Sequence, residues 1–305
     1  MKCYLCGNEN ISKRNGKVRD NNEIDILECE ECGLVFLSKF CTNEKFYIDN
    51  KMNDLSFFQH SKRIDFQNNG KQTLLNNYIE TLSKDKEEAI KFRLKFVKEQ
   101  IIAKNILDFG SGRAEFLILA KEYAKTVSGV EIEQQVEKIY ENNNIKLYRD
   151  LDDINLIEGE GYDIITAFHV IEHLHDPIGI LKRLSFKLKD NGKIIIEVPN
   201  ANDALLTIFQ NKSYQNFIYW SPHLYYFNTH TLSMIAKKAG LHVDFIKCIQ
   251  RYSISNNLYW LANGLPAGQK HWGKFIDNPI LQNAYEQTLA SLGATDTLIA
   301  QFSKI

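Results

Sequence analysis

The sequence predicts an α/β fold, in which helices cover a mostly parallel sheet, preceded by a small cysteine-rich module. Two observations carry this prediction: strand-like apolar runs alternate with helical periodicity from residue 105 onward, and two Cys-x-x-Cys pairs lie within the first 32 residues. With 305 residues, 44% of them hydrophobic, the chain is long enough for one large core with appendages.

A glycine-rich turn follows the first strand of the predicted core. The run Ile106–Gly112 ends in an acidic residue and two glycines, and such a turn lets the backbone approach a nucleotide-like cofactor closely. Residues 114–123 then read as a helix and residues 126–130 as a second strand. That strand ends in Glu131, about twenty residues after the glycines, where a doubly wound fold places a carboxylate for a ribose. Taken singly, the turn also occurs without a ligand, and Glu131 alone is better explained as a solvated charge at a strand end.

The spacing of the glycines discriminates between cofactors. Dinucleotide-binding turns carry a third glycine, which lets the next helix pack closely while its N-terminus faces a pyrophosphate. In this chain Glu115 occupies that position, and a carboxylate at the start of a helix repels an anion. The turn therefore favours a cofactor without phosphates.

Further segments follow the turn in a consistent order. The pattern LDFGSGRAEFL at 107–117 and the strand end GVEIE at 129–133 precede two apolar runs, Tyr162–Leu174 and Asn191–Asn200. In this order the four segments resemble the motifs of class I S-adenosylmethionine (SAM) methyltransferases. The run Pro222–Phe227 with the following Thr-Leu pair is similar to a branch that methylates small molecules.

The resemblance implies a fold, a cofactor and an activity. It implies a Rossmann-like, seven-stranded class I methyltransferase sheet within residues 105–305, SAM as the cofactor, and SAM-dependent methyltransferase activity on a small-molecule substrate. Strands at 241–253 and 297–303 are expected to close the sheet as an antiparallel pair around an insertion, residues 254–296. Because this insertion is rich in aromatic residues, it is expected either to stack on a sugar or base or to form a homodimer interface.

The resemblance also implies the cofactor contacts. The two glycines would admit the methionine part of SAM, the acidic residue before them would support the loop, and Glu131 would bind the ribose. Residues after the second, third and fourth strands would flank the adenine and the methionyl end. The expected cofactor-binding residues are Asp108, Phe109, Gly110, Ser111, Gly112, Glu131, Ile132, Asp150, Leu151, Phe168 and His169.

A histidine is the expected general base for a hydroxyl acceptor, because its pKa lies near working pH. His223 is the first candidate, since it follows the fifth strand, where an acceptor would bind. His173 and His169 follow the fourth strand and are the next candidates. We expect no catalytic metal, because magnesium-dependent methyltransferases of the catechol type place acidic residues where this chain has Phe168, His169 and Val170.

The cysteines of the N-terminal module predict a metal site. Cys3 and Cys6 form one pair and Cys29 and Cys32 another, each followed by a glycine, and four thiolates in this pattern satisfy tetrahedral zinc. A redox dithiol and two disulfides are the alternatives. Disulfides are disfavoured in a reducing cytoplasm, and a redox Cys-x-x-Cys should open a helix after a strand. Cys41 and Cys248 have no such partner and are expected to be buried.

The chain is therefore expected to have three parts and few classes of partner. Residues 1–42 form a zinc ribbon, residues 43–104 a helical cap or lid, and residues 105–305 the methyltransferase core. A net charge of −1, with lysines interspersed among acids, argues against a nucleic-acid partner. No apolar run approaches the roughly eighteen residues of a membrane span, and the first residues lack the apolar stretch of a secretory signal. We expect no membrane partner and a cytoplasmic location.

The class of methyl acceptor is indicated only by the presence of a four-cysteine module together with a methyltransferase core. A four-cysteine module joined to such a core is similar to sugar C-methyltransferases, which act next to a keto group and carry a much longer C-terminal domain. The shorter chain favours O-methylation of a nucleotide-linked sugar or surface-glycan precursor. Two alternatives stay open: sugar C-methylation, and a non-catalytic zinc module that binds SAM or a partner.

Overall fold

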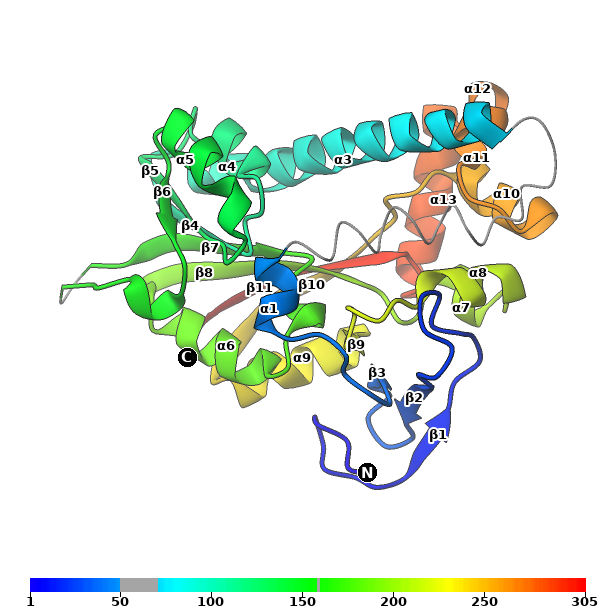
Figure 1. Cartoon of the computed structure of the whole chain (residues 1–305), viewed down its shortest axis with the longest axis horizontal. Helices are drawn as coiled ribbons and strands as arrows, with labels where there is room; N and C mark the ends of the chain where they lie inside the picture. The colour runs from blue at the N-terminus through cyan, green and yellow to red at the C-terminus, as the bar shows by residue number, and fades with distance from the viewer. Residues whose placement is uncertain (50–70, 158–159) are drawn as a thin grey trace. The chain divides into compact units, whose positions relative to one another are not determined.

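The computed structural model describes the backbone of residues 1–49, 71–157 and 160–305, and their side chains except those of 71–85 (Figure 1). The described chain forms two compact units. One comprises Met1–Cys41 together with Ile165–Ile305, and the other comprises Thr42–Ile164. The three-part division expected from the sequence stays a prediction.

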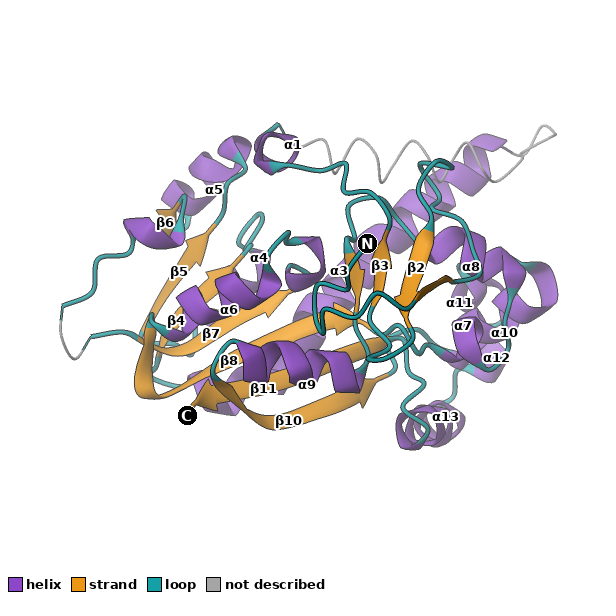
Figure 2. Ribbon diagram, turned by 90° about the horizontal axis from the view of Figure 1, so that it is seen from below, coloured by secondary structure: helices purple, strands orange, loops and turns teal. Residues whose placement is uncertain are grey.

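Seven strands form the central sheet, in the order β10-β11-β8-β7-β4-β5-β6 (Figure 2). β4, β5 and β6 pair in parallel, whereas β11 runs antiparallel to both β8 and β10. This topology confirms the predicted Rossmann-like α/β fold and its antiparallel closing strands. The strands are β4 (Asn105–Phe109), β5 (Thr126–Val130), β6 (Lys146–Tyr148), β7 (Tyr162–Phe168), β8 (Leu188–Pro199), β10 (Leu241–Ile249) and β11 (Thr297–Lys304).

In the unit Thr42–Ile164, one helix packs as its periodicity predicts. α4 (Glu115–Ala120) buries Phe116, Leu117 and Ala120, which lie on one face of the helix. Residues 50–70 lie outside the described residues, so the expected cap at 43–104 is represented by α1 and α3. The remaining helices of this unit are α1 (Glu44–Ile48), α3 (Lys71–Ile101), η1 (Gln134–Val136), α5 (Glu137–Asn142) and η2 (Leu151–Asp153).

In the other unit, side-chain caps fix the starts of several helices, among them α6 and α9. The Asp176 carboxylate accepts from the N–H of Gly179 at 3.0 Å and begins α6, and Asn228 accepts from the N–H of Thr231 at 2.9 Å and begins α9. α9 packs on β10, β11 and α6 (Figure 2). The helices before β10 are η3 (Ile171–His173), α6 (Pro177–Ser185), α7 (Ala204–Thr207), α8 (Lys212–Ile218) and α9 (Thr229–Lys238).

The N-terminal module forms a second sheet. β1 (Ile11–Lys13), β2 (Ile26–Cys29) and β3 (Val35–Leu37) pair antiparallel, and β9 (Tyr225–Tyr226) adds a fourth strand beside β3. The module also shares its hydrophobic core with residues far along the chain. This core contains Val18, Ile24, Ile26, Val35, Leu37, Ala201, Leu205, Leu206, Tyr214, Tyr219, Tyr226 and Trp260.

The aromatic insertion departs from the sequence prediction at its start. The strand expected over 241–253 ends at Ile249, because the N–H groups of Arg251 and Tyr252 donate to the carboxylate of Asp296 instead of to a strand. Trp260 is only 3% exposed and belongs to the core, so it offers no surface for stacking or dimerisation. The insertion forms α10 (Ile254–Asn263), α11 (Gly268–His271), α12 (Gly273–Ile276) and α13 (Pro279–Ser291).

Two smaller expectations concern cysteines and membranes. Cys41 is exposed, so the prediction that it is buried was wrong, and Cys248 is partly buried. A single unpaired cysteine carries no spacing that reports its depth, which explains the error. Over the described ranges, we find no helix with the length and apolar character to cross a membrane.

Asp203 is a buried carboxyl group with an unusual environment. Its Oδ1 accepts from the N–H of Leu205 at 2.8 Å and its Oδ2 accepts from the Tyr214 hydroxyl at 2.7 Å. Burial, helped by the nearby Asp296 carboxylate, raises the pKa of Asp203 to about 7 from its usual 3.8. The folded protein therefore retains a proton at Asp203 that the unfolded chain releases near pH 4.

This pKa shift predicts a stability difference that depends on pH. The protonated Asp203 carboxyl contributes stability to the folded protein. This contribution is fully present below about pH 4 and is lost as the pH rises to about 7. As the pH rises from about 5.5 to about 8, the unfolding free energy of Asp203→Asn should rise by about 2 kcal/mol relative to that of the wild type. Urea denaturation at each pH measures this change. Asp190→Asn, at a fully exposed position, is the matched control and should show no such change. An Asp203→Asn difference that is constant with pH would contradict the assigned pKa.

Candidate functional site

The predicted cofactor loop follows β4 and turns at two glycines. Gly110 has a φ of +69° and Gly112 of +50°, a left-handed region in which a side chain is strained. The N–H groups of Gly110 and Ser111 donate to the carbonyl of Val130 at 2.9 and 3.2 Å. The loop is therefore fastened to the end of β5.

Gly129 in β5 permits this close approach. A Cβ added at Gly129 would lie 2.3 Å from Ser111 Oγ and 2.9 Å from the Tyr140 side chain. Any larger residue would have to displace the Ser111 hydroxyl and the Tyr140 ring. Gly129, two residues before Glu131, therefore leaves room for the Ser111 and Tyr140 side chains.

The Glu131 carboxylate and the Tyr140 hydroxyl hold the loop from one side. Glu131 Oε2 accepts from the N–H of Gly112 at 2.7 Å, and Oε1 accepts from the N–H of Glu133 at 2.9 Å. The Tyr140 hydroxyl donates to the Gly112 carbonyl at 3.1 Å and lies 2.6 Å from Ser111 Oγ. Burial raises the pKa of Tyr140, so this hydroxyl stays protonated. Tyr140 was not anticipated from the sequence, because an aromatic residue on a helix is indistinguishable from a core residue.

The other expected cofactor residues of this unit lie at strand ends. Asp108 is only 4% exposed at the end of β4, and Phe109 and Ile132 are partly exposed. Asp150 is exposed and accepts from the N–H of Asp152 at 2.8 Å, capping η2, whereas Leu151 is buried. Their contacts with SAM stay predictions.

Arg149 supports the segment after β5 and was not anticipated. Its Nη1 donates to the carbonyls of Glu131 and Glu133, at 3.1 and 2.7 Å. Burial and the neighbouring Glu131 charge raise the pKa of Glu133. In the sequence, a single arginine after a strand reads as a solvated charge, so only the structure identifies this role.

His169 lies in the other unit, immediately after Phe168 at the end of β7. Its Nδ1 is 3.0 Å from Glu172 Oε1 and its Nε2 is 3.1 Å from Glu197 Oε1, and both carboxylates are fully buried. Arg251 Nη1 contacts the same His169 nitrogen and lies 3.2 Å from Glu197 Oε1. Burial lowers the pKa of His169, but the two carboxylates outweigh it and the net shift is upward. With both ring nitrogens engaged, His169 is better suited to orient Glu172 than to accept a proton.

His173 and His223 face one another within the same unit. Their ring centroids are 4.6 Å apart in an edge-to-face arrangement. His173 Nδ1 is 2.9 Å from the Pro222 carbonyl, so it carries the proton and leaves Nε2 as the acceptor. Burial lowers the pKa of His173, and burial with the nearby His173 and Arg19 lowers that of His223 further. Both imidazoles are therefore neutral near pH 7.

Glu172 joins this pair to form a three-residue group. Ligand atoms of Glu172, His173 and His223 all lie within 4.8 Å of one another. In the described part of the chain, Glu172 Oε2 and His223 Nδ1 are buried without a hydrogen-bond partner. Two imidazoles and a carboxylate are a donor set for a divalent cation, and the same atoms are able to accept a substrate proton. From the sequence we expected no catalytic metal, and this grouping was not anticipated.

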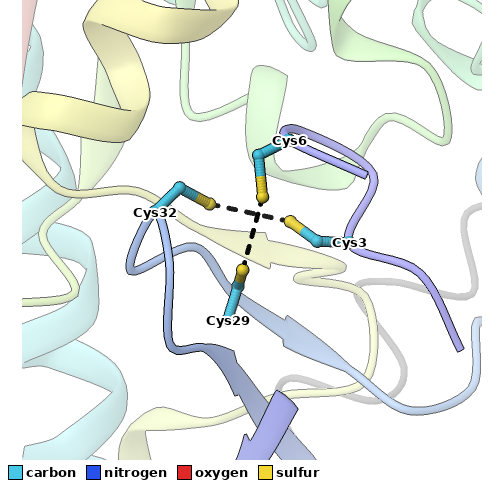
Figure 3. A group of neighbouring side chains, drawn as sticks. All are labelled: Cys3, Cys6, Cys29 and Cys32. Carbon is cyan, nitrogen blue, oxygen red and sulfur yellow. Dashed lines mark hydrogen bonds between the residues drawn. The ribbon is translucent and has the colours of Figure 1, made fainter. Parts of the chain in front are cut away.

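The four cysteines of the N-terminal module converge (Figure 3). Cys3 Sγ is 3.6 Å from Cys32 Sγ, Cys6 Sγ is 3.5 Å from Cys29 Sγ, and all four lie within 4.8 Å of one another without a disulfide. The N–H groups of the following glycines donate back to the carbonyls of Cys3 and Cys29, at 2.9 and 2.8 Å. This arrangement of four thiol groups fits a closed tetrahedral metal site.

Fold and loop together define a class of enzyme. A glycine turn after the first core strand, a carboxylate at the end of the second, and an antiparallel closing strand in a seven-stranded sheet are the arrangement of a class I SAM-dependent methyltransferase. Residues 80–244, more than half of the chain, match the family described as a methyltransferase domain. The chain belongs to this family, and SAM is its cofactor.

The relatives that carry a specific enzyme name are only distantly similar to this chain. The chain is 26% identical over 189 residues to a ubiquinone biosynthesis O-methyltransferase of Hydrogenovibrio crunogenus, covering 54% of this chain and 77% of that protein. It is 24% identical over 176 residues to the protein of the same name from Coxiella burnetii, covering 54% and 75%. Among solved structures, a SAM-dependent methyltransferase from Archaeoglobus fulgidus matches with a TM-score of 0.48 and 20% identity, over 74% of this chain and 99% of that one.

These names bear on the acceptor expected from the sequence. The two relatives are O-methyltransferases of ubiquinone biosynthesis and not sugar methyltransferases. The comparisons therefore do not support the expected resemblance to sugar enzymes.

Proposed function

We propose that this methyltransferase moves the methyl group of SAM to a hydroxyl of a small polar metabolite, and that His223 accepts the hydroxyl proton. The observation that carries the proposal is the buried His223 Nδ1, which has no hydrogen-bond partner within the described residues. Leaving a buried polar atom unpaired is costly, so such an atom is suited to a group that arrives with the substrate. His173, whose Nδ1 is held by the Pro222 carbonyl, is the second candidate.

The reaction is an in-line displacement at the sulfonium of SAM. The acceptor oxygen forms a bond to the methyl carbon while the carbon–sulfur bond breaks, and S-adenosylhomocysteine leaves. The hydroxyl proton passes to the neutral imidazole, whose lowered pKa keeps it unprotonated near pH 7. Positioning of donor and acceptor supplies much of the remaining rate.

A divalent cation is the alternative way of activating the hydroxyl at the same residues. Glu172, His173 and His223 would hold the ion, which would lower the pKa of a bound hydroxyl. EDTA separates the two forms of the proposal. Turnover that survives EDTA supports the imidazole base, whereas turnover that is lost and then restored by added Mg²⁺, Mn²⁺ or Zn²⁺ supports the metal.

The acceptor is proposed by class. The N-terminal cysteine module favours a nucleotide-linked sugar or surface-glycan precursor, and the names of the relatives favour a ubiquinone precursor as the second choice. Sugar C-methylation and a non-catalytic SAM-binding module remain the alternatives. Mass spectrometry of SAM turnover against both classes of acceptor tests the proposal, because product mass and position separate O- from C-methylation. Heat of SAM binding without turnover on any acceptor would favour the non-catalytic module.

We also propose a structural zinc ion at the four cysteines. Protein purified without chelator should contain about one zinc per chain at these thiolates, measured by plasma mass spectrometry. Cys6→Ser should lower the zinc content, and the matched control Cys41→Ser, at an exposed cysteine of the same module, should not. Well under one zinc per chain in the wild type would rule the site out. A homodimer formed through the insertion and a cytoplasmic location also stay proposals.

A further inference from the structure

Residues of the N-terminal module contact the turn that carries His223. Asp20 Oδ1 accepts from the N–H of Ser221 at 2.9 Å, and Asp20 Oδ2 accepts from the Ser221 hydroxyl. The N–H of Arg19 donates to the carbonyl of Tyr219 at 2.8 Å. The Arg19 guanidinium lies 4.6 Å above the Trp220 ring, a cation–π distance. Three successive residues before Pro222 are thus held by two neighbouring residues of the module.

The other side of His223 is held by the same module. The N–H of Leu37 donates to the carbonyl of Leu224 at 3.1 Å, and the N–H of Leu224 donates to the carbonyl of Glu172 at 2.8 Å. β3 then pairs with β9, with Phe36 opposite Tyr225. The backbone of the module is therefore connected through Leu224 to Glu172 itself.

His223 depends on this support because, within the described residues, its Nδ1 has no hydrogen-bond partner. Its ring is in contact with the rings of Trp220, His173 and Tyr226, at centroid distances of 5.4, 4.6 and 5.6 Å. Trp220 in turn lies beneath Arg19. The orientation of the His223 ring is thus set by the backbone of the turn and by its contact with Trp220.

We propose that Asp20 is a positioning residue for His223, acting through Ser221 and assisted by Arg19 on Trp220. Asp20 hydrogen-bonds to Ser221, two residues before His223, so we expect it to act on the reaction through the turn. The kinetic part of this inference rests on the proposed function, because it requires His223 to take part in turnover. The structural part, the placement of the imidazole, does not.

The test compares Asp20→Ala with Asp25→Ala. Asp25 lies in the same module, where its carboxylate is exposed and pairs with Lys13 at 2.8 Å, so it controls for a general effect on the module. The readout of placement is the rate at which diethyl pyrocarbonate modifies His223 and His173, followed by peptide mass spectrometry. Asp20→Ala should raise this rate several-fold and lower kcat about 10- to 100-fold, with unchanged SAM affinity by calorimetry. Asp25→Ala should change none of these.

Two further variants keep the inference falsifiable. Asp20→Asn retains an oxygen acceptor for the N–H of Ser221 and should restore most of the turnover. Ser221→Ala removes only the hydroxyl donor and should show a smaller change in the same direction, so it serves if Asp20→Ala does not fold. Unchanged modification rates in Asp20→Ala or, if that variant does not fold, in Ser221→Ala would overturn the inference. So would a loss of SAM affinity equal to the loss of turnover.

The outcomes also separate this inference from the proposed function. If His223→Ala turns over normally while Asp20→Ala accelerates modification of His223, the positioning role stands and the base assignment fails. If His223→Ala is inactive and Asp20→Ala leaves the modification rates unchanged, the base assignment stands and the positioning role fails.

Discussion

Glu131→Ala is expected to raise the dissociation constant for SAM at least about 100-fold. The substitution removes the carboxylate that accepts from the N–H of Gly112, and it also removes the expected partner of the ribose. Asp108→Ala, at the end of β4, should weaken binding in the same way. Isothermal titration with SAM and with S-adenosylhomocysteine measures both effects.

Two comparisons sharpen this experiment. Glu137→Ala removes an exposed carboxylate that lies 3.7 Å from Arg149 in the same unit, and it should leave SAM affinity unchanged. Glu131→Gln keeps an oxygen for the N–H of Gly112 but not the charge. Its affinity for SAM should therefore lie between that of the wild type and that of Glu131→Ala. Unaltered affinity in both Asp108→Ala and Glu131→Ala would refute the assignment of this loop to the cofactor.

His223→Ala should reduce turnover about 100-fold or more while leaving SAM affinity unchanged. The reason is the loss of a neutral, buried imidazole whose Nδ1 has no hydrogen-bond partner in the part of the chain that the structure describes. Single-turnover kinetics with a saturating acceptor measures the change in the chemical step. The matched control is His242→Ala, at an exposed position of β10, which should be fully active.

Other outcomes would redirect the assignment. Normal turnover in His223→Ala would move the role of base to His173, because both ring nitrogens of His169 are already engaged. Glu172→Gln distinguishes the two ways of activating the hydroxyl. If a cation is bound, the weaker amide ligand should raise the metal concentration needed for turnover; if an imidazole acts alone, added metal should have no effect.

Features that depend on nearby residues were predictable from the sequence. β5 has the bounds expected from its apolar pattern, and the glycine loop and the cysteine pairs lie where their spacing placed them. In each case a few consecutive residues fix the geometry, either through a positive φ in a turn or through a continuous run of buried residues in a strand.

Features that depend on distant residues were not predictable. Arg251 reaches Glu197 and His169 only because β10 ends at Ile249 and the chain turns toward Asp296. The grouping of Glu172 with His173 and His223 requires residues from two loops. A single sequence carries no spacing signal for such pairs, since any number of residues can separate them.

The four-stranded sheet of the N-terminal module has a consequence for biosynthesis. β3 leaves the ribosome about 190 residues before its partner β9, which corresponds to roughly 10 to 40 seconds at ordinary rates of translation. During this interval β3 is an open edge that is able to pair with other chains. Because the pairing is so distant in sequence, its formation is slow to nucleate. Overproduced protein should therefore aggregate mainly through nascent chains that have not yet reached residue 226.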